Sequence, residues 1–196
     1  MEIVSATVGL APRLAYLINL AGEGLPEYLW SGMAEADESP LDVGSRRAAR
    51  TEGGFSYTNA RVCMESGVLL GMIVAYRLPD PCDVGDLAGY PAPVRPLVQL
   101  EARAPGSWYV NALATYPEHR GRGVARALMA DAAGRARAAG CEVMSLIVAS
   151  GNAAALGLYD AIGYQVARTL PVVPYPGCPH GGEWVLMTHR LSSEPR

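Results

Sequence analysis

The chain has 196 residues, half of which are hydrophobic, and a formal net charge of −3 at pH 7. This length and composition suit one domain with a substantial core, and without a basic or acidic block we expect no nucleic-acid or membrane partner. The N-terminus lacks a signal-peptide pattern, no apolar run approaches the ~20 residues of a membrane span, and the four cysteines are too scattered for a zinc site. We therefore expect a cytoplasmic protein without a bound metal.

The first half of the chain alternates between helical and strand patterns. Pro12 and Pro26 each stand near the start of an apolar repeat at helical spacing, and proline suits the first turn of a helix. Ser66-Gly67 separates two apolar runs and is typical of a hairpin turn. The predicted elements are a strand at residues 2–8, helices at 12–22, 25–36 and 41–51, and strands at 57–65 and 68–77.

A proline-rich stretch then interrupts these patterns. Residues 78–96 contain five prolines and three aspartates, which predicts a long irregular loop. We expect one domain over residues 1–196, with an irregular insertion at about 78–100. In the second half, one helix is expected to open within residues 120–125 and another to begin at Asn152, and a further irregular loop spans 171–182. The predicted strands are at residues 109–115, 142–149, 164–169 and 184–190.

The hexapeptide RGRGVA at residues 120–125 joins a buried strand to a helix. The first turn of a helix leaves main-chain N–H groups without partners at the positive end of the helix dipole, where they attract an anion. Gly121 and Gly123 carry no Cβ, so a ligand can approach the main chain closely. The segment indicates a pyrophosphate site, the alternative being an ordinary glycine turn before a surface helix. Positive charge is added by Arg120, Arg122 and Arg126.

Two common phosphate-binding motifs do not fit this hexapeptide. The dinucleotide fingerprint needs Gly or Ala where this chain has Arg126, and the P-loop needs a lysine, which the chain lacks. The pattern Arg/Gln-x-x-Gly-x-Gly/Ala does fit, with Arg120, Gly123 and Ala125 at its fixed places. In this it resembles the coenzyme A pyrophosphate loop of the GCN5-related N-acetyltransferase (GNAT) superfamily.

A second motif strengthens the resemblance. Residues 152–164 read N-x-x-A-x-x-L-Y-x-x-x-G-Y, which is similar to the acetyltransferase motif that runs from Asn through Tyr to Gly-Phe/Tyr. Two motifs in the right order and separation are much more specific than either alone. The resemblance implies the GNAT fold of the α/β class. This fold has a mixed, mostly antiparallel sheet flanked by helices, with the parallel strands at residues 109 and 142 splayed around the coenzyme.

The resemblance also implies roles for particular residues. The hexapeptide would bind the pyrophosphate of acetyl-CoA, and the end of the preceding strand would bind the pantetheine arm, with one N–H holding the oxyanion of the tetrahedral intermediate. Tyr159 would protonate the leaving thiolate, unless it is simply a core aromatic. Asn152 would contact the coenzyme, cap its helix, or do both. The expected coenzyme-binding residues are Leu113, Ala114, Thr115, Arg120, Gly121, Arg122, Gly123, Val124, Ala125 and Asn152.

The general base is left open by the sequence. Some members of the family carry a glutamate in the strand before the phosphate loop, and this strand has no carboxylate. A base is still needed, because only the neutral amine is a nucleophile. Glu118, beside the loop, reads as a solvated turn residue. The candidates are Glu101, Glu183, His180, and a water chain that includes Asn111 or Tyr109.

The resemblance implies an enzyme that transfers an acetyl group from acetyl-CoA to a primary amine by direct attack. The alternatives are a non-catalytic coenzyme A-binding sensor or regulatory module, and a transferase of longer acyl chains. The acceptor, a small molecule or a peptide amine, is not identified by the sequence. Glu23 and Glu27 would attract a cationic amine or are merely solvated, and Tyr28, Trp30 and Tyr175 would line a pocket or fill the core. A homodimer that pairs the strand at residues 184–190 is a further expectation.

Overall fold

The computed structural model describes residues 1–192, which form a mixed α/β fold. The helices are α1 (Ala11–Ala21), α2 (Leu25–Ser31), α3 (Pro40–Ala48), α4 (Arg95–Glu101), α5 (Val124–Ala138) and α6 (Ala153–Ala161). The strands are β1 (Glu2–Ser5), β2 (Ala60–Glu65), β3 (Val68–Arg77), β4 (Trp108–Thr115), β5 (Val143–Ala149), β6 (Gln165–Pro171) and β7 (Glu183–Arg190).

The seven strands pair in the order β1-β2-β3-β4-β5-β7-β6. Strands β4 and β5 are parallel, whereas the pairs β1–β2, β2–β3, β5–β7 and β6–β7 are antiparallel. The parallel register joins only Trp108–Val110 to Met144–Leu146 and does not continue along either strand. The predicted fold class, with its mostly antiparallel sheet and one parallel pair, is confirmed.

The pairing of β7 contradicts the expectation that the strand at residues 184–190 joins two subunits into a homodimer. Strand β7 pairs with β5 along one edge and with β6 along the other. Both of its edges are therefore occupied, and it offers no free edge to a second subunit. The insertion of β7 between two earlier strands is a long-range pairing that no local pattern signals.

The chain forms two compact units that share β4 and α5. Unit 1 comprises residues 1–76, 111–132 and 176–179, and unit 2 comprises residues 77–110, 133–175 and the chain from His180 onward. The expectation of a single domain with an insertion stays a prediction.

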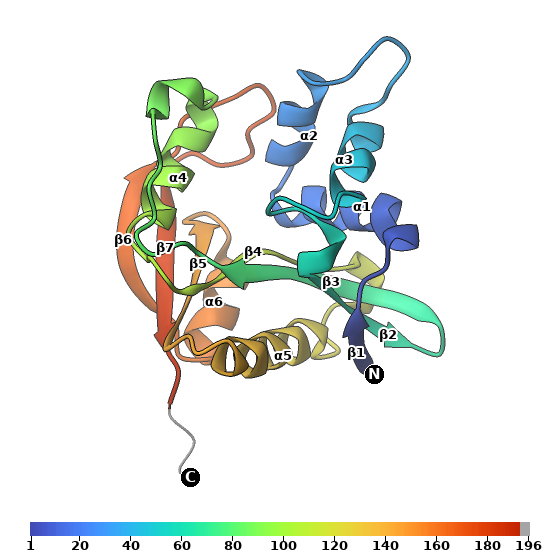
Figure 1. Cartoon of the computed structure of the whole chain (residues 1–196), viewed down its shortest axis with the longest axis vertical. Coiled ribbons are helices and arrows are strands. Elements are labelled where there is room, and N and C mark those ends of the chain that lie inside the picture. The colour runs from blue at the N-terminus through green and yellow to red at the C-terminus, as the bar shows by residue number, and fades with distance from the viewer. Residues whose placement is uncertain (193–196) are drawn as a thin grey trace. The chain divides into compact units, whose positions relative to one another are not determined.

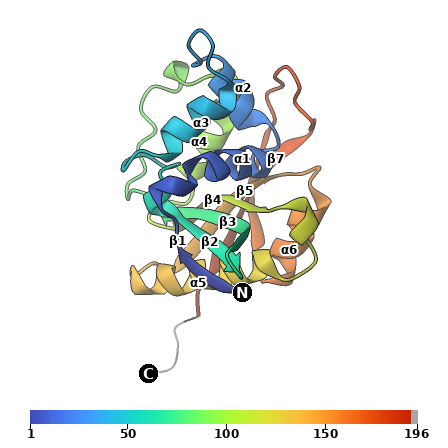
Figure 2. The same ribbon diagram turned by 90° about the vertical axis from the view of Figure 1, so that its right-hand side faces the viewer.

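Unit 1 is built on a core between its helices and strands. Figure 1 shows α1, α2 and α3 on one side of β1–β3, with the start of α5 on the other side, and Figure 2 shows the same layers turned by 90°. Arg61 of β2 reaches Asp131 of α5 with two hydrogen bonds of 3.2 and 3.3 Å, which tie the helix to the sheet. The core includes the fully buried side chains Leu14, Leu17, Ile18, Val43 and Met72.

Unit 2 gathers α4, α6 and the end of α5 around β5, β6 and β7. The hydroxyls of Ser107 and Ser145, both buried, lie 2.6 Å apart and join the start of β4 to β5. The guanidinium of Arg135 on α5 lies 5.2 Å from the centre of the Trp108 ring. These contacts fix the start of β4 from both sides, and β4 then continues into unit 1.

Several predicted elements have different bounds in the structure. Strand β1 ends at Ser5 rather than at residue 8, and helix α3 ends at Ala48 rather than at residue 51. Helix α2 ends at Ser31, because Gly32 follows it as the C-cap. Residues 57–59 form a 3-10 turn capped by Ser56, so β2 begins only at Ala60. Part of the proline-rich segment is helical, since Pro96 stands in the first turn of α4, where its missing N–H costs nothing.

Two glycines inside helices give a matched test of packing in unit 1. A Cβ added to Gly44 of α3 would lie 2.4 Å from the Trp30 ring, whereas one added to Gly134 of α5 would meet nothing within 4 Å. Alanine favours a helix interior over glycine by about 1 kcal/mol. Gly134→Ala should therefore stabilise the protein by about that amount. Gly44→Ala should destabilise it by about 1–3 kcal/mol through overpacking. Urea unfolding of both variants measures the difference, and a stabilised Gly44→Ala would contradict the packing described here.

Candidate active site

The connection between β4 and α5 has the geometry expected of an anion-binding turn. The φ angles of Gly121 and Gly123 are +74° and +82°, and a Cβ at either residue would point into open space. The first main-chain bond of the helix runs from the N–H of Ala127 to the carbonyl of Gly123. The amides of residues 124–126 therefore have no partner within the helix. The helix itself is anchored by the buried side chains of Val124, Leu128 and Ala132.

The three arginines predicted to surround this turn are not equivalent. The guanidinium of Arg122 binds the carboxylate of Glu65 at the end of β2, and this hydrogen bond holds the pKa of Glu65 below its usual range. Arg120 and Arg126 are exposed, and neither forms an ion pair with any of residues 1–192. Two cationic side chains therefore stand at the turn without a fixed carboxylate partner.

The end of β4 presents groups on both sides of the strand. Ala114 is buried, whereas Leu113 and Thr115 are half-buried. The hydroxyl oxygen of Thr115 is itself buried and has no hydrogen-bond partner among the described residues. A buried hydroxyl without a partner is costly, by about 1–3 kcal/mol, and a ligand with polar groups at this strand end would relieve the cost.

Two features near the turn were missed from the sequence. A Cβ on Gly71 of β3 would lie 2.5 Å from the carbonyl oxygen of Ala114 and 3.1 Å from Val124, so only glycine allows this close approach of β3, β4 and α5. Tyr116, directly after β4, stacks on Tyr16 of α1 with ring centres 5.6 Å apart. A glycine inside the apolar run of β3 could have indicated the close approach at residue 71, because glycine in a strand often marks such a contact. No local pattern indicates the stack of Tyr116 on Tyr16.

In unit 2, Asn152 and Tyr159 lie on helix α6. The side chain of Asn152 accepts a hydrogen bond of 3.0 Å from the N–H of Ala155 and so caps the helix, as one of its two expected roles requires. Tyr159 is 8% exposed, and its ring lies 5.9 Å from that of Tyr164, which stacks on His189 of β7. The coenzyme contact of Asn152 and the catalytic role of Tyr159 stay predictions.

The candidates for the general base differ in their surroundings. Glu101 accepts a hydrogen bond from Tyr109, and burial raises its pKa from 4.5 to about 7. Glu183 is exposed and accepts a hydrogen bond of 2.9 Å from the hydroxyl of Thr169. His180 lies close to Gly151 in a loop. The raised pKa of Glu101 suits a base at neutral pH. In unit 1, Asn111 donates a hydrogen bond of 2.8 Å to the hydroxyl of Tyr76.

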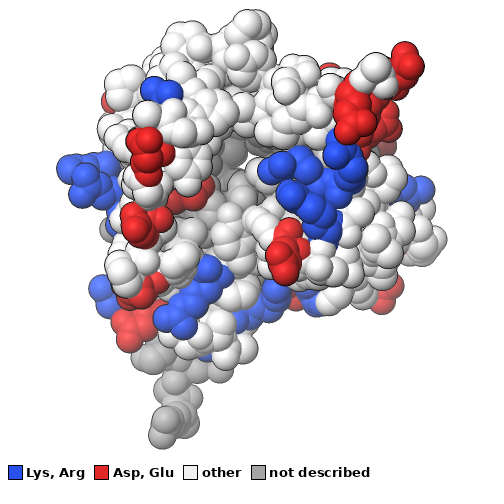
Figure 3. All heavy atoms as spheres, turned by 45° about the horizontal axis from the view of Figure 1, so that its top comes forward, with Lys and Arg blue, Asp and Glu red and all other residues white. Residues whose placement is uncertain are grey.

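The residues expected on the acceptor side are partly engaged in structure. Both the main-chain N–H and the carboxylate of Glu27 bond the side chain of Asn19, at 2.9 and 2.8 Å. Trp30 is 2% exposed and belongs to the core of unit 1, which is the second of its two expected roles. Figure 3 shows a cluster of arginine side chains beside acidic ones, in the region of α3, where Arg46 pairs with Glu38 at 2.8 Å.

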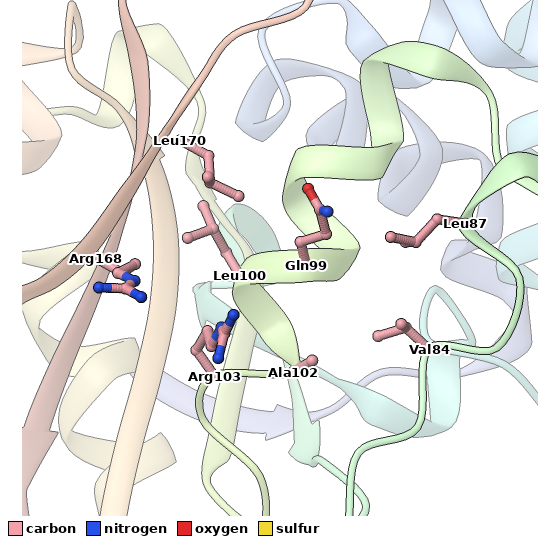
Figure 4. A pocket seen from close by; sticks show the side chains of 8 residues that line it. All are labelled: Val84, Leu87, Gln99, Leu100, Ala102, Arg103, Arg168 and Leu170. Atoms are coloured by element: carbon pink, nitrogen blue, oxygen red, sulfur yellow. The ribbon is translucent and has the colours of Figure 1, made fainter.

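A groove of about 340 Å³ crosses the outer side of α4 in unit 2. Figure 4 shows Arg103 and Arg168 near one end and the aliphatic side chains of Val84 and Leu87 at the other. None of the predicted site residues lines this groove, and neither does Glu101, which accepts a hydrogen bond from Tyr109. The remaining lining residues are Gln99, Leu100, Ala102 and Leu170.

Comparison with known proteins identifies the family of the chain. The model of the acetyltransferase (GNAT) family matches residues 25–164, which include both motifs. The chain belongs to this family. It is an acetyltransferase that uses acetyl-CoA, as the resemblance implied. The left-handed glycines of the turn, its two arginines that form no ion pair within residues 1–192, and the Thr115 hydroxyl at the end of β4, which has no partner in the same residues, fit an anionic, hydrogen-bonding substrate.

Individual relatives agree with the family. An L-methionine sulfoximine/L-methionine sulfone acetyltransferase of Pseudomonas paraeruginosa is 27% identical over 137 residues, which cover 70% of this chain and 68% of the relative. The structure of a polyamine N-acetyltransferase from Drosophila melanogaster matches with a TM-score of 0.69 at 19% identity, over 97% of this chain and all of that one. The yncA protein of Salmonella typhimurium, solved with acetyl-CoA, matches with a TM-score of 0.61 at 18% identity, over 100% of this chain and 96% of that one.

Two further properties concern the whole described chain. Among the helices within residues 1–192, none combines the length and the hydrophobicity that crossing a bilayer requires. Within the same residues, no three side chains of His, Cys, Asp or Glu gather into a group that could hold a metal ion.

The raised pKa of Glu101 makes stability depend on pH in a defined window. Its pKa rises from 4.5 to about 7 on folding. The folded protein therefore holds this proton over a range where the unfolded chain has lost it, and stability falls as pH rises from 4.5 to 7. Glu101→Gln removes this loss, so its stability relative to wild type should improve by on the order of 2 kcal/mol across the window. Urea unfolding at pH 5 and pH 8 measures the change. Glu142→Gln, at an exposed carboxylate, is the control and should show no such change. If the free energy of unfolding of Glu101→Gln differed from that of the wild type by the same amount at both pH values, the raised pKa of Glu101 would be contradicted.

Proposed function

We propose that the protein transfers the acetyl group of acetyl-CoA directly to a primary amine of its acceptor. The observation that carries the proposal is the turn at residues 120–126 in a chain of the GNAT family. This turn combines two glycines of positive φ, main-chain amides without helical partners and two arginines that form no ion pair within residues 1–192. Such a turn suits a pyrophosphate, which carries negative charge and many acceptor oxygens.

The residues of the chain would divide the reaction among them. The amides at the start of α5 and the side chain of Arg120 bind the pyrophosphate. The main chain of residues 113–115 holds the pantetheine arm, and one of its N–H groups stabilises the oxyanion that forms when the amine attacks. Tyr159 donates a proton to the departing thiolate. Asn152 combines a coenzyme contact with the helix cap seen in the structure.

The acceptor is proposed to be a small molecule with a primary amine. A relative that covers 70% of this chain is named for L-methionine sulfoximine and L-methionine sulfone, which are amino acids, and a protein of similar fold is named for polyamines. A screen of amino acids, polyamines and agmatine that follows thiol release from acetyl-CoA tests this proposal. Tight binding of coenzyme A without turnover of any amine would favour the non-catalytic module instead.

We also propose that the chain forms one domain and acts in the cytoplasm.

Replacing Gly123 tests the pyrophosphate turn. An L-residue at a φ of +82° is strained by about 1–2 kcal/mol, so the turn of Gly123→Ala should relax and its N–H groups should rotate away. Coenzyme A would then have to supply the strain energy when it binds, which should weaken its affinity by about tenfold or more. Isothermal titration calorimetry with coenzyme A measures the affinity.

Gly140→Ala is the matched control for this change. Gly140 has a φ of +72°, and a Cβ there also points into open space, but the residue lies beyond the far end of α5. Its substitution should cost similar stability and leave the affinity for coenzyme A unchanged. Equal affinities for Gly123→Ala and the wild type would remove the turn from the binding site.

Tyr159→Phe tests the proposed general acid. Loss of the hydroxyl should lower kcat by about 10²-fold and leave the affinity for coenzyme A within a factor of two or so, because the ring is kept. Tyr164→Phe is the matched control, since its hydroxyl is buried and has no hydrogen-bond partner within residues 1–192. Its activity should equal that of the wild type. Steady-state kinetics on an amine found in the screen measures both, and a fully active Tyr159→Phe would exclude the role.

A further inference from the structure

The reaction needs a group that takes a proton from the amine, and strand β4 contains no carboxylate. The last carboxylate before the strand is Glu101, the final residue of helix α4. A short turn at residues 102–107 joins this helix to β4, and several bonds hold it. The hydroxyl of Ser107 donates to the carbonyl of Ala104 at 2.7 Å, and the N–H of Leu78 donates to the carbonyl of Ser107 at 2.9 Å.

This turn brings the carboxylate back to the strand. Tyr109, the second residue of β4, is 4% exposed and donates its hydroxyl hydrogen to the side chain of Glu101. Tyr109 belongs to the same strand whose far end, at residues 113–115, is proposed to hold the acyl donor. The carboxylate of Glu101, which lies outside β4, is therefore linked to this strand through the phenol of Tyr109.

Within residues 1–192, no cation pairs with Glu101. From β4 it faces Tyr109. In the segment after β3, burial raises the pKa of the Cys82 thiol, and the nearby charges of Glu101 and Asp83 raise it further. Arg103, in the turn after α4, and Arg168, on β6, line the groove. Arg95, at the start of α4, donates to the main-chain carbonyls of Ala88 and Tyr90. Burial without a cation disfavours the carboxylate, which is why the pKa of Glu101 lies near 7 and why the group can exchange a proton at neutral pH.

We propose that Glu101 accepts the proton of the acceptor amine through the hydroxyl of Tyr109. The inference rests on the proposed acetyl transfer. The ammonium group gives one proton to the oxygen of Tyr109 while Tyr109 gives its own proton to Glu101, so the phenol stays neutral and the carboxylate becomes a carboxylic acid. The neutral amine then forms the C–N bond, the C–S bond breaks, and the second proton of the nitrogen balances the one that the thiolate takes up. Glu101 returns its proton to solvent.

The two other candidates lack this arrangement. Glu183 is exposed, and its carboxylate accepts a hydrogen bond from the hydroxyl of Thr169 on β6. His180 stands in the loop before β7 rather than beside β4. The contact between Glu101 and Tyr109 therefore selects one of the candidates that the sequence left open.

The pH dependence of kcat/KM for acetyl transfer tests the assignment. The wild type should show an ascending limb with a midpoint near pH 7. Glu101→Gln should lose this limb and about 10²-fold in kcat, with the affinity for coenzyme A unchanged in calorimetry. Tyr109→Phe should also lose activity, and its residual limb should move to higher pH, because the hydrogen bond from Tyr109 favours the ionised carboxylate. Glu142→Gln, at an exposed carboxylate, should match the wild type.

A direct titration separates the failure of this assignment from the failure of the proposed function. In protein labelled with ¹³C at the glutamate carboxyls, one NMR signal should titrate near pH 7 and be missing in Glu101→Gln. If acetyl transfer proceeds and Glu101→Gln keeps both its rate and its limb, the assignment is wrong while the proposed function stands. If coenzyme A binds but the wild type acetylates no amine, the proposed function fails and the assignment falls with it, whatever the titration shows.

Discussion

The site depends on one constraint of the main chain, the change of direction between β4 and α5. The chain must leave a buried strand and enter a helix while its amides stay exposed to a ligand, and it does so through two glycines with φ angles of +74° and +82°. Side chains would strain both positions. The charge of the helix dipole is felt only within the first turn of the helix. The glycines must therefore directly precede that turn, so that a ligand can approach its exposed amides.

The surrounding elements fix this turn from several directions. Gly71 lets β3 lie against Ala114 and Val124, Tyr16 stacks on Tyr116, and Arg61 holds α5 through Asp131. These contacts come from β3, α1 and β2, so the turn is held by elements distant in the chain. A binding turn held in this way is preorganised, and a ligand need not supply the free energy for ordering it.

Features that depend on neighbouring residues could be predicted from the sequence. The glycine turn before α5, the cap at Asn152 and the hairpin at Ser66-Gly67 follow from residue type and spacing, and all of them occur in the structure. Features that depend on long-range packing could not. The place of β7 between β5 and β6, the stack of Tyr16 on Tyr116 and the raised pKa of Glu101 all arise from segments brought together by the fold. For this reason the sequence could name Glu101 as a candidate but could not choose it.

The pKa of Glu101 also bears on which amine the enzyme can deprotonate. A lysine-like amine has a pKa of about 10.4, so transfer of its proton to an ordinary carboxylate at 4.5 costs about 8 kcal/mol. Transfer to a carboxylate with a pKa of about 7 costs about 4–5 kcal/mol. For an α-amine, whose pKa is about 8, the cost falls to about 1 kcal/mol. With Glu101 as the proposed base, its burial lowers the free-energy cost of proton transfer from every amine, and an α-amino acceptor would be nearly matched to it.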